Sequence, residues 1–171
     1  MNRHSDSLLL ARIRAWTLFF IAALMVSGLT AVPLRPEMHL LVGIFAQDRP
    51  PTALGSWLLA VQSAVDDVGE RWPFLALGTD WLAFGHVVIG LGFIGLLRDP
   101  VRNDWLITWG IMACLLVLPW AWGFGLARGI PWGWRLIDCS FGVGGLVPML
   151  LIRRDVLELK RRLAHPTEPS P

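Results

Sequence analysis

The chain has 171 residues, of which 54% are hydrophobic and 16% charged, whereas charged residues make up about a quarter of an ordinary soluble domain. Its formal net charge of +2 gives no reason to expect a nucleic-acid partner. The composition therefore excludes an ordinary soluble protein and indicates one that lies in a lipid bilayer.

Four runs with few or no charged residues follow one another along the chain. Crossing the ~30 Å hydrocarbon core takes roughly 20 helical residues, and about 17 to 25 are accepted. The first run is longer than the ~7–15 apolar residues of a secretion signal, so we interpret it as an uncleaved anchor. We predict an all-α membrane protein of one domain, residues 1–171, with four transmembrane helices at about 15–34, 80–97, 105–127 and 134–152.

A long outer loop, residues 35–79, joins the first two predicted spans. Pro50 and Pro51 break regular structure there, and Thr52 can cap a helix that starts after them. Apolar residues then recur at helical spacing and predict an outer amphipathic helix, on the membrane face or on a partner. They are Trp57, Leu58, Val61, Ala64, Val65 and Val68. The apolar segment 38–46 is too short to span and is expected to be interfacial too.

The distribution of lysine and arginine predicts the orientation of the spans. With the N-terminus inside, most of the 15 basic residues fall on the inner side, including those of a tail at residues 153–171. Because basic loops stay in the cytoplasm, we expect both termini and this tail to be cytoplasmic. Within the tail, apolar and basic residues alternate over 156–163 and predict a short surface helix near anionic lipid heads.

Three segments in the second half of the chain resemble a family of small bacterial four-span integral membrane proteins. They are GTDWLAFGH from Gly78, LRDPVRN from Leu97 and RGIPWGWRLIDCSFG from Arg128. The resemblance implies the four-span fold and a multi-pass location in the bacterial inner (cytoplasmic) membrane. It implies no activity and transfers no catalytic residue.

Ionisable residues gather at the predicted outer ends of the second and fourth spans. Arg135 lies three residues before Asp138, on the same helix face, and can pair with it. Ionisable groups in a membrane are costly and often functional. The polar cluster that we predict consists of Asp80, His86, Arg128, Arg135 and Asp138. It can act as an ion-pair clamp between the two spans, as a ligand site, or as a route for protons or a solute.

His86 is the candidate cofactor-binding residue, because one imidazole can hold a haem iron or the magnesium of a chlorophyll-type pigment. Glycines at 85, 90, 92 and 95 would let a flat ring approach, but close helix packing is their commoner use. We therefore predict no resident cofactor and no metal, with haem or bacteriochlorophyll on His86 as the alternative. Cys114 and Cys139 form no CxxC motif and are expected at different depths, not joined.

The sequence contains no nucleophile with its base, no paired carboxylates at catalytic spacing and no phosphate-binding loop, so we expect no enzyme. The favoured hypothesis is a non-catalytic accessory or assembly subunit of a larger energy-converting membrane complex, photosynthetic or respiratory, whose other membrane subunits are its partners. One alternative is a small transporter or proton-conducting bundle that uses Asp138, His86 and Asp80. Another is a protein that binds haem or a chlorophyll-type pigment through His86.

Overall fold

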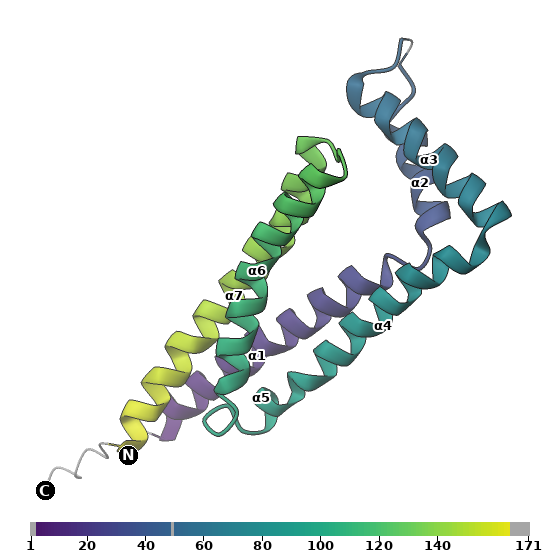
Figure 1. Cartoon of the computed structure of the whole chain (residues 1–171). Helices are drawn as coiled ribbons and strands as arrows, with labels where there is room; N and C mark the ends of the chain where they lie inside the picture. Colours follow the sequence, from purple (N-terminus) through teal and green to yellow (C-terminus); the bar gives the residue numbers. More distant parts are fainter. Residues whose placement is uncertain (1–2, 49, 165–171) are drawn as a thin grey trace, which may run out of the picture. The chain divides into compact units, whose positions relative to one another are not determined.

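The computed structural model describes residues 3–48 and 50–164, which form helices and no strand (Figure 1). The α-helices are α1 (Arg3–Leu29), α2 (Leu34–Phe45), α3 (Ala53–Arg71), α4 (Leu77–Gly92), α5 (Ile94–Arg98), α6 (Trp105–Ala127) and α7 (Trp132–Ala164), with a short 3-10 helix, η1 (Pro73–Ala76), before α4. The helical stretches long and apolar enough to cross a membrane are Asp6–Leu29, Pro73–Arg98, Trp105–Ala127 and Trp132–Ala164. The prediction of an all-α membrane protein with four spans is confirmed.

The chain divides into two compact units. Unit 1 contains Met1–Ala22 and Leu91–Pro171, and unit 2 contains Ala23–Gly90. Unit 1 therefore holds the first part of α1 together with α5, α6 and α7. Unit 2 holds the end of α1, then α2, α3 and nearly all of α4.

In unit 1, α6 and α7 run side by side (Figure 1). Glycines on their facing sides let the backbones approach closely. A Cβ atom added at Gly142 would lie 2.6 Å from the carbonyl oxygen of Cys114, and one at Gly110 would lie 2.8 Å from Sδ of Met149. Small residues are the usual means of helix packing in a bilayer, because lipid is as apolar as the side chains and gives no hydrophobic driving force between helices.

The turn from α6 to α7 closes the C-terminal end of α6. Gly129 takes a φ of 66°, in the left-handed region that favours glycine. Its N–H donates to the Leu126 carbonyl at 3.1 Å, and the N–H of Ile130 donates to the Gly125 carbonyl at 2.9 Å. These two bonds form a Schellman motif, which satisfies carbonyls that the helix end would otherwise leave unpaired.

The core of unit 1 receives side chains from each of its helices. Phe93, which is 1% exposed, lies at the break between α4 and α5. Its ring centroid is 4.8 Å from that of Phe20 on α1 and 5.6 Å from that of Trp109 on α6. Such aromatic pairs contribute about 0.5–1.5 kcal/mol beyond their burial. The break in the second span thus places Phe93 at the centre of the unit 1 core.

In unit 2, α2 and α3 lie side by side and form a helical hairpin outside the predicted spans (Figure 1). Thr52 caps α3 as predicted, because its Oγ1 accepts a hydrogen bond from the Gly55 N–H at 3.1 Å. Met38 of α2 and Leu58 of α3 are buried. The segment expected to be interfacial is therefore largely α2, and α3 is the predicted amphipathic helix.

The first span ends earlier than residue 34. α1 stops at Leu29, and the Thr30 hydroxyl donates to the Ser27 carbonyl at 2.9 Å in the turn that follows. Pro33, the N-cap of α2, belongs to this turn, and a proline cannot continue a helix because it lacks the N–H donor. The predicted span included residues 30–34 because none of them is charged.

The fourth span continues well beyond residue 152. α7 runs to Ala164, because residues 153–164 contain strong helix formers and neither glycine nor proline. Residues 156–163 therefore continue α7 and do not form the separate surface helix that we predicted. Val156 and Leu159 are buried in unit 1. Residues 165–171 of the predicted tail lie outside the described ranges.

Candidate functional site

The five residues of the predicted polar cluster divide between the two units. Arg128, Arg135 and Asp138 belong to unit 1, whereas Asp80 and His86 belong to unit 2. An ion-pair clamp between the second and fourth spans therefore stays a prediction. What the structure does give is the immediate surroundings of each residue within its own unit.

Arg135, in the first turn of α7, packs against α6. A Cβ atom added at Gly125 would lie 2.5 Å from Cδ of Arg135, so the glycine leaves the room that the arginine stem occupies. The guanidinium carbon lies 4.7 Å from the centroid of the Trp122 ring. Nε and Nη1 of Arg135 are buried and have no hydrogen-bond acceptor among the described residues. The arginine is thus held by a cation–π contact and by packing.

Asp138 is half-buried, one turn after Arg135 on α7. Their spacing permits an ion pair, but among the described residues the Asp138 carboxylate takes part in no ion pair, and Arg135 lies over Trp122 instead. Arg128 follows α6 as its exposed C-cap, and its N–H donates to the Phe124 carbonyl at 3.0 Å. Within unit 1, the predicted cluster is therefore three separate groups.

His86, in α4, lies against the end of α1 within unit 2. A Cβ atom added at Gly28 would lie 2.3 Å from Cβ of His86, whereas nothing lies within 4 Å of one added at Gly85 or Gly92. The glycine that makes room for His86 is therefore on α1 and not among its sequence neighbours. Nδ1 of His86 lies 2.8 Å from the Leu82 carbonyl and must donate to it, because a carbonyl only accepts.

This hydrogen bond leaves Nε2 of His86 without its hydrogen in the neutral ring, so Nε2 is the atom that could bind a metal ion. No group of three or more His, Cys, Asp and Glu suited to a metal ion occurs in the part of the chain that the structure describes. Cofactor binding through His86 stays a prediction, which a visible absorption spectrum of the purified protein tests. Cys114 and Cys139 are not joined, as predicted.

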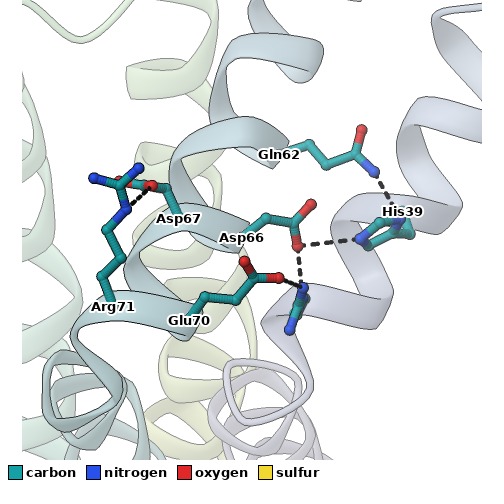
Figure 2. Close-up of polar contacts among 7 residues, drawn as sticks. His39, Gln62, Asp66, Asp67, Glu70 and Arg71 are labelled. Carbon is teal, nitrogen blue, oxygen red and sulfur yellow. Dashed lines mark hydrogen bonds and ion pairs between the residues drawn. The ribbon is translucent and has the colours of Figure 1, made fainter.

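The best-connected polar group of unit 2 is an ionic cluster between α2 and α3 (Figure 2). From α2, Arg35 contacts Asp66 through Nε at 2.6 Å and Glu70 through Nη2 at 2.8 Å. His39, one turn further along α2, lies 3.2 Å from the same Asp66 oxygen through Nε2. Gln62 donates from Nε2 to Nδ1 of His39 at 2.7 Å. Residues 62, 66 and 70 repeat every four positions, so one face of α3 supplies all three partners.

The charges of this cluster reinforce one another. The hydrogen bond from Arg35, and then the one from His39, hold the pKa of the Asp66 carboxyl below its ordinary value. The hydrogen bonds that Arg35 donates to Asp66 and Glu70 raise the pKa of its guanidinium in turn. Asp66 is therefore ionised at neutral pH and draws the two helices together. Sequence analysis placed these residues in the outer loop without assigning them a partner.

A second carboxylate that sequence analysis missed is Asp155, in α7. Its side chain is only 3% exposed. Oδ1 accepts from Nη2 of Arg12 at 3.0 Å and from Nε of Arg154 at 3.2 Å. The sequence does contain a signal for it, since Asp155 falls at helical spacing between the apolar Ile152 and Leu159, on a face that a solvated charge would avoid.

Comparison with protein-family models, with curated proteins and with solved structures finds no match to this chain. The resemblance to small four-span bacterial membrane proteins accordingly stays a prediction. Any function assigned to the chain must come from its own side chains, and the two arginine–carboxylate clusters are the best-formed polar groups among those described.

Proposed function

We propose that the protein is a non-catalytic accessory or assembly subunit of a larger membrane complex, and that the α2–α3 hairpin docks onto a partner subunit. The observation that carries this proposal is the distribution of side chains on the hairpin. Most of its charged side chains are engaged with one another, whereas Leu40 and Ile44 are 63% and 57% exposed on α2.

Leu40 and Ile44 are four residues apart, so they lie on one helix face. Exposed apolar surface costs about 25 cal/mol per Å² relative to burial, which favours covering this face. A partner that offers an apolar groove fits a helix with anchors at this spacing. An energy-converting complex, photosynthetic or respiratory, is the partner that we favour by analogy with the small helical subunits of such assemblies.

The same proposal includes the location and orientation of the chain. We place it in the bacterial inner membrane with both termini in the cytoplasm, because most of its basic residues then fall on the inner side. The α2–α3 hairpin is then on the outer side. Cysteines introduced at Ser7 and Ser63 test this, since only the second should react with an impermeant label added from outside.

Native gel electrophoresis of membranes solubilised in mild detergent tests the docking hairpin. The wild-type chain should migrate in a complex much larger than its own 19.1 kDa. The double variant Leu40→Gln, Ile44→Gln should leave the complex, and a photo-crosslinker placed at position 44 should attach the chain to one defined membrane protein. Leu163→Gln, at an exposed leucine in the last turn of α7, is the matched control and should stay in the complex. A wild-type chain that migrates alone would contradict the proposal.

A second candidate function, conduction of protons or a small solute, is favoured by one observation. Asp138 lies in a span and takes part in no ion pair among the described residues. Ionisable residues inside a membrane mark proton relays in pumps and transporters. Flux in proteoliposomes that Asp138→Asn abolishes, while thermal stability stays unchanged, would establish conduction instead of the accessory role.

A further inference from the structure

A pocket of about 440 Å³ opens between the beginning of α1 and the end of α7, within unit 1. It is lined by Leu9, Arg12, Arg154, Asp155, Glu158, Arg161 and Arg162. Four guanidinium groups converge on a volume large enough for a lipid headgroup. None of these residues belongs to the hairpin on which the proposed docking role depends.

The buried Asp155 fixes the positions of two of these guanidinium groups. Arg12 and Arg154 donate to the same oxygen, Oδ1, from opposite sides of the α1–α7 contact. Each guanidinium has five N–H donors and uses one of them here. Both side chains are at least half exposed, so their remaining donors are accessible from the pocket. Two arginines held at fixed positions are a preorganised site for an oxyanion.

The charged side chains around the pocket leave an excess of positive charge on one side. Glu158 pairs with Arg161 at 3.5 Å and with Arg162 at 2.8 Å, and Asp6 pairs with Arg162 at 3.4 Å. Two acids thus face two arginines on that side. On the other side, Asp155 is the one acid among the described residues that pairs with Arg12 and Arg154, which leaves an excess of one positive charge there. A phosphodiester carries one negative charge and would neutralise it.

The position of the pocket along the helices fits the headgroup layer of a bilayer. Arg12 precedes the first apolar run by three residues and Arg154 follows the fourth by two, so they lie ~4.5 and ~3 Å beyond the apolar ends. The headgroup layer is roughly 5–8 Å thick on each side of the hydrocarbon.

We propose that this pocket binds the phosphodiester group of one anionic phospholipid, through Arg12 and Arg154 positioned by Asp155. Basic pockets between helix ends are a recurrent mode of anionic lipid recognition. The lipid joins α1 to α7 at their polar ends, where the glycine contacts of the α6–α7 pair do not reach.

Native mass spectrometry of the delipidated full chain, titrated with phosphatidylglycerol, tests the proposal. The wild type should bind one molecule saturably. Phosphatidylcholine has the same phosphate but an ammonium that cancels its charge, and it should bind about fivefold more weakly or worse. Replacing Arg12 and Arg154 together by glutamine should weaken phosphatidylglycerol binding about 25-fold, at about fivefold for each arginine.

Arg153→Gln is the matched control, because Arg153 is the exposed neighbour of Arg154 and does not line the pocket. This control should bind phosphatidylglycerol as the wild type does. Equal losses in the control and in the double variant would overturn the proposal, because they would mean attraction to surface charge in general. Equal affinity of the wild type for the two lipids would overturn it as well.

Two further measurements keep the proposal falsifiable if the double variant folds poorly. Arg154→Lys keeps the charge but loses the planar fork, and it should weaken phosphatidylglycerol binding less than Arg154→Gln does. Glycerol 3-phosphate and inorganic phosphate should not displace the lipid from the wild type at equal concentration. Displacement by either would assign the pocket to a soluble phosphate and reject the lipid.

Discussion

The α6–α7 pair and the α2–α3 pair are both helical hairpins of one chain, yet different interactions hold them. In the first, backbones approach at Gly142 and Gly110, and no ion pair joins α6 to the apolar part of α7 among the described residues. In the second, Asp66 and Glu70 of α3 pair with Arg35 of α2 in full reach of water. The surroundings explain the difference. In lipid, close packing of the backbones is the main attraction between helices. In water, charged side chains stay solvated and can pair across the two helices, so the backbones do not need to approach closely.

Burial separates two carboxylates of similar chemistry in the same way. Asp155 and Asp66 are each held by an arginine and one further cation or imidazole, but their side chains are 3% and 28% exposed. Water cannot solvate a buried charge that loses its partner, whereas it can solvate an exposed one. The same kind of ion pair should therefore matter far more in unit 1 than in unit 2.

Asp155→Asn should have the largest effect on stability. Removing one member of a buried ion pair costs ~3–5 kcal/mol, and we expect about 2–3 kcal/mol here because Arg12 and Arg154 keep contact with water. Chemical unfolding in detergent micelles measures this. Asp67→Asn, at an exposed aspartate that pairs with Arg71 on the same helix, is the control and should change little. Equal effects at both positions would remove the distinction between the units.

Gly142→Ala should have the next largest effect. The new Cβ atom would lie 2.6 Å from the backbone oxygen of Cys114, so the two helices must separate. Overpacking of this kind costs typically about 1–3 kcal/mol. Thermal unfolding of the purified protein measures it, with Gly144→Ala as control, because nothing lies within 4 Å of a Cβ atom there. A stable Gly142→Ala variant would mean that α6 and α7 do not depend on close backbone contact.

Thr52→Ala should loosen the start of α3 by about 1 kcal/mol, because the Gly55 N–H loses its acceptor. Hydrogen exchange at the first turn of α3 reports this locally, and the spans should keep their protection. Ser56→Ala, one turn later and exposed, should leave the exchange unchanged. Faster exchange in the spans would show that the hairpin and the bundle unfold together.

Acid should weaken the α2–α3 pair, with the smallest effect of the four. The folded pKa of Asp66 is lower than its unfolded value, so the cluster stabilises the hairpin fully above the ordinary aspartate pKa of ~4. That contribution is lost as the pH falls from about 4 through the lower folded pKa. Hydrogen exchange of α3 between pH 5 and 2 measures this loss, with wild type and variant compared at each pH. Asp66→Asn should reduce the dependence, and Glu70, which also pairs with Arg35, should account for what remains.

Sequence alone predicted the elements whose ends are marked by charge. α6 runs over Trp105–Ala127 as predicted, because Asp104 and Arg128 bracket an uninterrupted apolar run. The end of α7 was predicted too early, at residue 152, because hydropathy locates the residues that lie in the hydrocarbon and not the residue at which the helix ends. Helix formation continues wherever the residues favour it, and residues 153–164 do.

The polar groups were harder to predict, because their partners are distant in sequence. Spacing suggested Arg135 for Asp138, but Trp122 on the neighbouring helix competes for the arginine. Asp155 meets Arg12 across 143 positions, a contact that no local pattern contains. In contrast, the amphipathic helix α3 was predicted from the spacing of its apolar residues, whereas the contacts of Asp66 with α2 were not.

The length of α7 has a mechanical consequence. Its 33 residues extend ~50 Å, about 20 Å more than the hydrocarbon that it crosses. The excess is continuous with the membrane-spanning part, but Pro148 lies between this polar end and the outer end that carries Arg135 and Asp138. A proline removes one backbone hydrogen bond, so a tilt applied to the polar end of α7 should bend the helix at Pro148 before it reaches those residues.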